Sequence, residues 1–179
     1  GVFVRGQATL ADLVSMTWLT PQMDRLFLDG AAERRRFLDR LVYGFDPDHA
    51  GRVTAYDHAL RERARLLRGV GAPAPDTGWL AALEEQLAAQ GVAIAAARRE
   101  LAARLGRAAA AGVGPFPRAG LAIDGAVEGW LDEMPALAAE ETLRHRLAES
   151  RAEDAETGGA RWGPHRSDLA VTHLAKGVS

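Results

Sequence analysis

The chain has 179 residues, with 24 acidic and 22 basic side chains and a formal net charge of −2 at pH 7. This length fits one domain, or one compact part with an extended arm, and the charge is not that of an obligate nucleic-acid binder. The sequence has no cysteine, which excludes disulfides, thiolate catalysis and cysteine-based zinc sites. Lys176 is the one lysine. Arginine is the better residue for two-point phosphate contacts, but a genome rich in G and C produces the same bias.

Hydropathy and the two termini bear on where the protein acts. No run approaches the ~20 apolar residues of a membrane span. The start of the chain is not a signal peptide, because Arg5 interrupts its short apolar run. We therefore expect no membrane association and a cytoplasmic location. The chain begins without methionine and ends directly after a strand-like segment, so we interpret it as part of a longer protein.

The first part of the chain predicts short strands and then helices. Residues 2–4 and 14–19 read as strands, and Pro21 should end the second because proline cannot donate to a strand ladder. Residues 22–28 have helical spacing. A further helix begins near Ala31, with Asp29 as its expected N-cap.

The middle of the chain is predominantly helical. A helix is predicted over residues 52–68 after a loop at 44–51, and the longest helical pattern spans 79–111. Large apolar residues recur along it at steps of three, four, seven and seven, which is a partial coiled-coil seam: Leu80, Leu83, Leu87, Ile94 and Leu101. We expect this seam to pack on the helices at 52–68 and 137–151. Gly91 and Gly106 mark points where the long helix can bend.

The last part of the chain predicts a short strand at 121–123, an amphipathic helix at 137–153 and a strand at 169–174. Strand patterns therefore stand at both ends, with helices between them. The predicted fold class is mainly α: a helical lobe of extended helices packed as an arm, with short β-strands at both ends that belong to a separate sheet-bearing body.

Arginines form the main candidate site. Between residues 33 and 68 there are nine arginines and six acids, a local excess of three. Candidates for DNA or dimer-partner contacts are Arg34, Arg35, Arg36, Arg61 and Arg65. Glu33 and Asp39 lie at ion-pair spacing from the first triplet, so a solvated, self-paired face is an equal alternative.

No arrangement of side chains predicts catalysis or metal binding. His165 and His173 do not have the spacing of a helical ligand pair, and no Ser/His/Asp set can be singled out. The acid pairs 84–85 and 140–141 are interpreted as solvated helix surface. A GxxxxGK[ST] phosphate loop is absent. His165 and Arg166 belong to a GPHR segment that predicts a rigid turn before a strand.

Several motifs resemble the RecF family, in the order of that family. They are the WLTP turn at 18–21, the DRLF segment at 24–27, the GAAERRRFLD block at 30–39 and the GPHRSDL segment at 163–169. The resemblance covers nearly the whole chain, but only the central part of the family. It implies a helical lobe inserted between two parts of an ATP-binding-cassette (ABC) ATPase head, whose three nucleotide motifs lie outside this sequence. The implied division is 1–30 for a flank of the head, 31–158 for the helical lobe and 159–179 for the return strands.

The resemblance also implies a function. The family binds DNA, including single strands, and ATP with Mg, and dimerises on ATP. It acts with RecO and RecR to help RecA load at gaps, in replication, recombinational repair and the SOS response. Gln22 lies near the place of a nucleotide-proximal glutamine, and His165 and Arg166 mark the return to the head. The full-length protein is expected to be a weak ATPase. The chain alone, without a phosphate loop, is expected neither to hydrolyse ATP nor to bind it tightly.

Two further hypotheses remain open. The helical lobe can be a dimerisation or partner-docking arm of an SMC-like ATPase with no direct DNA contact, in which case the seam serves association and the arginines are ordinary surface. It can also be an arm of another SMC-like ATPase.

Overall fold

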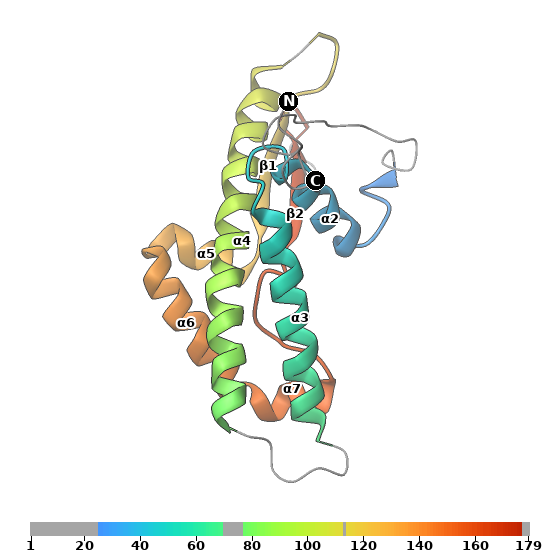
Figure 1. The fold of residues 1–179 in the computed structure, drawn as a ribbon. Coiled ribbons are helices and arrows are strands. Elements are labelled where there is room, and N and C mark those ends of the chain that lie inside the picture. The colour runs from blue at the N-terminus through green and yellow to red at the C-terminus, as the bar shows by residue number, and fades with distance from the viewer. Residues whose placement is uncertain (1–24, 70–76, 113, 177–179) are drawn as a thin grey trace, which may run out of the picture.

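The computed structural model describes residues 25–69, 77–112 and 114–176. The strands predicted at 2–4 and 14–19, the 18–21 turn and Gln22 lie outside these described residues. Three helices dominate the first part: α2 (Ala31–Val42), α3 (His49–Arg68) and α4 (Thr77–Ala111). α3 and α4 run side by side in opposite directions (Figure 1). At 35 residues and 1.5 Å per residue, α4 is about 50 Å long.

The second part of the chain wraps around α4. Strand β1 (Ala119–Asp124) leads into α5 (Ala126–Glu133), α6 (Ala136–Glu149) and α7 (Arg151–Thr157), and strand β2 (Asp168–His173) follows. β1 and β2 pair in antiparallel fashion, with Leu121 opposite Val171. In Figure 1 this hairpin lies beside α2 at one end of α4, and α7 lies near the other end. The mainly α fold with short strands is thereby confirmed.

Two apolar clusters hold the helices and the hairpin together. The larger cluster joins α3, α4, α5 and α6 and includes Ala59, Leu87, Ile94, Val127 and Leu143. The smaller one packs α2 and the hairpin on the second half of α4, through Leu38, Val42, Leu101 and Leu169. The hairpin therefore packs on α4 and on α2, the helix that carries the arginine triplet at 34–36.

The seam predicted on the long helix is confirmed. Its five large apolar residues are all buried, and α3 and α6 both pack on α4 as expected. Gly91 and Gly106, where the long helix could have been interrupted, do not break it, since α4 continues through both. Gly91 instead permits close packing: a Cβ there would lie 3.1–3.2 Å from Leu143, Tyr56 and Pro164.

Three local predictions were wrong. The N-cap of α2 is Gly30, not Asp29, and it makes no side-chain cap hydrogen bond. The single helix predicted at 137–153 is divided at Ser150 into α6 and α7. At this break the Ser150 hydroxyl donates a hydrogen bond to Asp154 in α7, at 2.8 Å. Glu84, interpreted as solvated surface, is buried because two arginines face it. Among the described helices, none is both long and apolar enough to cross a membrane.

Candidate nucleic-acid interface

A basic groove runs between α3 and the segment 158–166. It has a volume of about 730 Å³. The groove is lined by five arginines: Arg35, Arg61, Arg65, Arg68 and Arg166. Glu62 is the one acidic residue in the lining, so the formal charge of the groove is +4 (five minus one), whereas the net charge of the chain is −2. We call this groove, with all the residues that line it, the basic groove. It brings together three of the five predicted contact arginines with the two residues predicted in the return turn, His165 and Arg166.

One wall of the basic groove is a face of α3. Arg61, Arg65 and Arg68 stand at steps of four and three, so they lie on one side of the helix. Arg65 pairs with Glu62 at 3.0 Å and Arg68 donates to the carbonyl oxygen of Ala64. Arg61 is exposed and makes no ion pair within the described parts of the chain. These are solvated cations with spare N–H groups.

The opposite wall is the turn that was predicted before the last strand. Arg166 is exposed, and its Nε donates to the carbonyl oxygen of Ala160 at 2.9 Å. Beside it, His165 Nε2 lies 2.9 Å from the same oxygen and Nδ1 lies 2.7 Å from the Tyr56 hydroxyl. Burial lowers the pKa of His165 to about 4. The ring is therefore neutral at pH 7, with Nε2–H donating to Ala160 and Nδ1 accepting from Tyr56.

The turn fits closely against α3. Gly163 has φ +137°, a backbone region that favours glycine, and a Cβ there would lie 2.1 Å from the Tyr56 hydroxyl. On the far side, Arg98 donates to the carbonyl oxygen of Pro164 at 2.7 Å. The position of Arg166 in the groove wall is thus set by contacts from α3 and α4.

Arg35, on α2, also lines the groove. It is half-buried, and its Nη1 donates to the carbonyl oxygen of Ser167 at 2.7 Å. The pairing with Asp39 predicted from spacing is not formed. Asp39 instead accepts from Arg98 through both carboxylate oxygens, at 2.8 Å each, and lies 2.8 Å from His49. Burial raises the pKa of Asp39, but the His49 and Arg98 hydrogen bonds outweigh it and hold the pKa below its ordinary value.

The other two predicted arginines lie outside the basic groove. Arg34 makes a two-point ion pair with Asp168, at 2.6 and 2.8 Å, which ties α2 to the first residue of β2. That hydrogen bond lowers the pKa of Asp168. Arg36 is exposed and pairs with Glu33, as its spacing predicted, and it lines a smaller hollow next to the groove. Arg34 therefore links α2 to β2, and Arg36 lies on the surface beside the groove.

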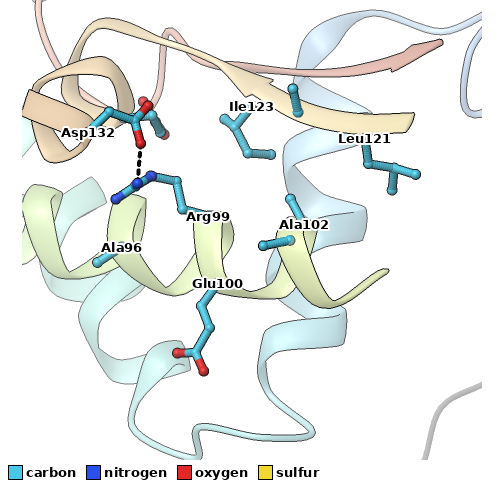
Figure 2. Close-up of a pocket in the computed structure, with 10 residues that line it drawn as sticks. Ala96, Arg99, Glu100, Ala102, Leu121, Ile123 and Asp132 are labelled. Carbon is cyan, nitrogen blue, oxygen red and sulfur yellow. Dashed lines mark hydrogen bonds and ion pairs between the residues drawn. The ribbon is translucent and has the colours of Figure 1, made fainter. Parts of the chain in front are cut away.

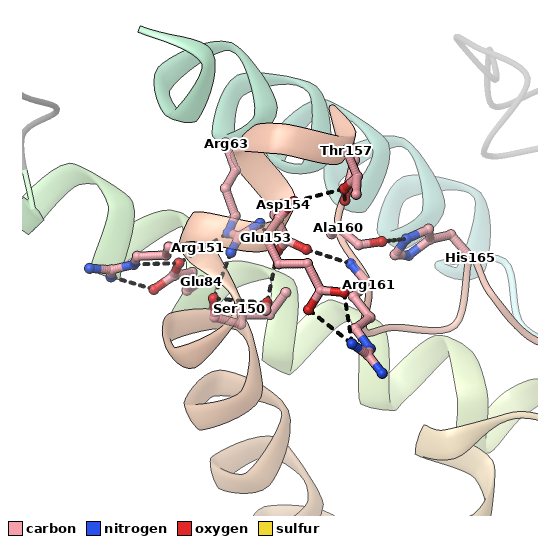
Figure 3. A network of polar contacts seen from close by, with 12 residues as sticks. Arg63, Glu84, Ser150, Arg151, Glu153, Asp154, Thr157, Ala160, Arg161 and His165 are labelled. Carbon is pink, nitrogen blue, oxygen red and sulfur yellow. Dashed lines mark hydrogen bonds and ion pairs between the residues drawn. The ribbon is translucent and has the colours of Figure 1, made fainter.

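A buried ionic cluster stands behind the groove face of α3 (Figure 3). Arg63 is almost fully buried and donates to Glu84 at 3.0 Å, to Asp154 at 2.7 Å and to the carbonyl oxygen of Leu147 at 2.6 Å. Arg151 donates to both oxygens of Glu84. A buried guanidinium needs partners for its five N–H groups, so Arg63 must keep facing Glu84, Asp154 and Leu147. This requirement fixes the rotation of α3 about its axis and keeps Arg61 and Arg65 facing outward.

Sequence reasoning missed this cluster, although a signal was present. Shifting the heptad phase on α4 gives positions 80, 84, 87, 91, 94, 98 and 101, which include Glu84, Gly91 and Arg98. All three are buried. Charged residues at seam positions indicate buried ion pairs. The seam was instead predicted from the large apolar residues alone, which place position 83 rather than 84 on the buried face.

A second hollow, of about 420 Å³, lies between α4, β1 and α5 (Figure 2). Its one arginine is already paired: Arg99 points at Asp132, as Figure 2 shows, and also donates to the carbonyl oxygen of Leu131. Glu128 also lines this hollow and has no hydrogen-bond partner among the described residues. Glu100 pairs with Arg104 on α4. With no spare cation of the kind seen at Arg61, this hollow is the weaker candidate for an anionic ligand.

Metal ions and nucleoside triphosphates bind to recognisable arrangements of residues. No group of three or more His, Asp or Glu side chains among the described residues is arranged to hold a metal. The whole sequence lacks the glycine-rich loop with lysine that cradles triphosphates. No chemical step is therefore assigned to a nucleotide on these residues.

The fold and the groove define the class: a mainly helical lobe that carries a β-hairpin and an arginine-lined groove.

No family model matches the chain. The chain resembles part of the DNA replication and repair protein RecF. It is 43% identical over 182 residues to RecF of Mesorhizobium japonicum, covering 99% of this chain and 47% of that protein. With RecF of Caulobacter vibrioides the identity is 48% over 172 residues, covering 93% and 44%. The chain therefore spans slightly less than half the length of these relatives.

Solved structures give the same fold. A structure of the recombination mediator protein RecF with ATPrS in the RecFOR pathway has a TM-score of 0.74 to this chain at 22% identity, covering 86% of this chain and 42% of that one. A structure of RecF with ATP gives the same TM-score. At this identity the likeness concerns the fold alone, and it supports the helical lobe with its hairpin.

Proposed function

We propose that this chain is the helical lobe, with its β-hairpin, of a RecF-like protein of DNA replication and repair, and that the basic groove binds DNA phosphates. The observation that carries the proposal is the gathering of five arginines from α2, α3 and the 158–166 segment in one groove. Resemblance to RecF at 41–48% identity supports the class of ligand. Phosphate contacts supply most of the affinity in such interfaces.

The geometry of the groove favours contact with the DNA backbone. At 1.5 Å per residue the steps of four and three between Arg61, Arg65 and Arg68 correspond to about 6 and 4.5 Å along α3, a spacing that lets neighbouring side chains reach successive phosphates. The groove lining has no Phe, Tyr or Trp within the described residues, and unpaired bases bind through such stacking surfaces. We infer that the groove contacts the phosphate backbone rather than stacking on unpaired bases.

The wider activity is proposed on the resemblance. The full-length protein binds ATP with Mg in a head beyond these residues, dimerises on ATP, and acts with RecO and RecR to help RecA load at gaps in DNA. The division into 1–30, 31–158 and 159–179, and the role of Gln22 near the nucleotide, stay predictions. The chain alone has no triphosphate loop, so ATP turnover belongs to the full-length protein.

The groove is tested by removing charge from one wall. In the full-length protein, the double substitution Arg61→Gln and Arg65→Gln should weaken binding of a short duplex about tenfold or more. It should also reduce the slope of log K against log salt by about 2, one unit for each arginine that no longer neutralises a phosphate. The measurement is fluorescence anisotropy at several salt concentrations. Arg144→Gln is the matched control, because Arg144 is an exposed, ion-paired arginine on α6. Equal slopes for all variants would contradict a DNA-binding groove.

The alternative is a dimerisation or docking arm without DNA contact. The seam that favoured it is buried inside this chain, between α4 and its neighbours, so it offers no surface to a second molecule. The arm hypothesis now depends on the groove arginines facing a partner. It predicts that the double substitution weakens ATP-driven dimerisation while the DNA affinity of the monomer stays unchanged.

A further inference from the structure

We propose that Arg35 couples the basic groove to β2: an anion in the groove supplies the counter-charge that Arg35 lacks and, through Arg35, holds the segment leading into β2 in place. The inference rests on the proposed phosphate-binding function of the groove. It adds a regulatory role for one groove residue, in which DNA occupancy and the position of the β-hairpin depend on each other.

Arg35 is a half-buried cation without a carboxylate partner among the described residues. The two nearest candidates are engaged elsewhere, since Asp39 binds Arg98 and His49, and Asp168 binds Arg34. Burial lowers the pKa of Arg35, and the neighbouring charge of Arg98 lowers it further. The charges of Asp168 and Asp39 raise it in part, but the pKa stays below its ordinary value, in keeping with a cation that has no carboxylate in direct contact.

The side chain has contacts on two sides. One N–H group, on Nη1, donates to the carbonyl oxygen of Ser167 at 2.7 Å. The same side chain lines the basic groove. A guanidinium has five N–H groups, so an anion in the groove can be bound without breaking the Ser167 contact. Attraction between the anion and Arg35 is strong because the site is partly shielded from water.

The segment held by Arg35 leads directly into the hairpin. Ser167 precedes Asp168, the first residue of β2, and the preceding turn is fixed by Arg98 at Pro164 and by Tyr56 at His165. β2 in turn pairs with β1 along its whole length. A change that tightens the Arg35–Ser167 contact therefore tightens the start of β2.

Thermodynamic linkage makes this coupling reciprocal. If an anion favours the Arg35–Ser167 hydrogen bond, then breaking that hydrogen bond must weaken anion binding by the same factor. Binding at one site typically changes the affinity of a coupled site by a factor of about 5 to 150. We therefore expect amide exchange at the start of β2 to slow by about fivefold or more when DNA occupies the groove.

The experiment is hydrogen–deuterium exchange of the full-length protein with and without a saturating short duplex, read on peptides covering residues 164–173. The wild type should show slower exchange in this region when DNA is bound. Arg35→Gln should bind DNA more weakly and, once saturated, show no slowing there. Arg68→Gln is the matched control: it removes one groove charge, and Arg68 contacts Ala64 rather than the 163–167 turn. It should keep the slowing at saturation.

Failure of the coupling and failure of the groove give different results. If the duplex binds equally well to the wild type and to the Arg61→Gln and Arg65→Gln double variant, the proposed function itself is wrong. If the duplex binds through the groove but residues 164–173 exchange at an unchanged rate, the coupling alone is overturned. Equal slowing in Arg35→Gln and the wild type also overturns it.

Discussion

At the residue scale, Glu128 shows how a single buried carboxyl is shaped by its surroundings. Its side chain is 2% exposed, and neither oxygen has a hydrogen-bond partner among the described residues. The nearby Ser167 hydroxyl donates to the carbonyl oxygen of Pro164 instead. A Cβ added to Gly125 would lie 2.2 Å from Glu128 Oε2, which shows how tightly the carboxyl is enclosed at the base of the hairpin. Burial accordingly raises the pKa of Glu128.

Glu128→Gln should stabilise the protein at neutral pH. A raised pKa in the folded state means that Glu128 stabilises the fold most when protonated, below its ordinary pKa of 4.5, and that this contribution is lost as pH rises through the folded pKa. Glutamine stays neutral, so the free energy of unfolding at pH 7.5 should rise. Urea unfolding at pH 7.5 and pH 4 measures this, and an equal effect at both pH values would rule out ionisation as the cause.

His165 should make stability depend on pH in the opposite sense. Its pKa falls from 6.5 to about 4 on folding, so between these values the unfolded chain binds the proton more tightly, and stability is lost as pH falls. The full effect is about 3 kcal/mol. We expect the stability difference between wild type and His165→Gln, measured by urea unfolding, to shrink from pH 7 to pH 4.5. A constant difference would show that this histidine does not titrate as its burial implies.

At the element scale, buried charge rather than helix propensity fixes how α3, α4 and α7 meet. Arg63 joins Glu84 on α4 and Asp154 on α7 while all three side chains are nearly inaccessible to water. A partner removed from such a cluster leaves an uncompensated charge in the interior. The exposed pair two residues further along α3, Arg65 with Glu62, has no such constraint.

Arg63→Met should therefore cost about 3–5 kcal/mol of unfolding free energy. Arg65→Met, on the same helix, should cost less than about 1 kcal/mol because exposed ion pairs contribute little. Urea unfolding of the two variants side by side gives the comparison. Similar small losses for both would mean that the cluster is not needed for the packing of α3.

At the scale of the whole molecule, charge is distributed unevenly. The chain carries a net charge of −2 while the basic groove alone carries +4. Net charge was the observation that argued against nucleic-acid binding, but a sum over the chain does not describe the local field of one groove. A groove lined with one sign of charge attracts polyanions even when the molecule as a whole is slightly acidic.

The sequence by itself determined the helices α2, α3 and α4, the strands β1 and β2, and the resemblance to RecF. The spacing of leucines predicted α4 and its two partners, and the motifs at 30–39 and 163–169 indicated RecF, because periodicity and short motifs are local properties of a chain. The tertiary structure alone decided which arginines share a surface. Arg35, Arg61 and Arg166 are far apart in the sequence and meet in one groove, whereas Arg34, next to Arg35, is turned toward Asp168. Charged side chains pair according to their positions in space. Those positions depend on contacts of α3 with α4 and α7, whose residues lie far apart in the sequence.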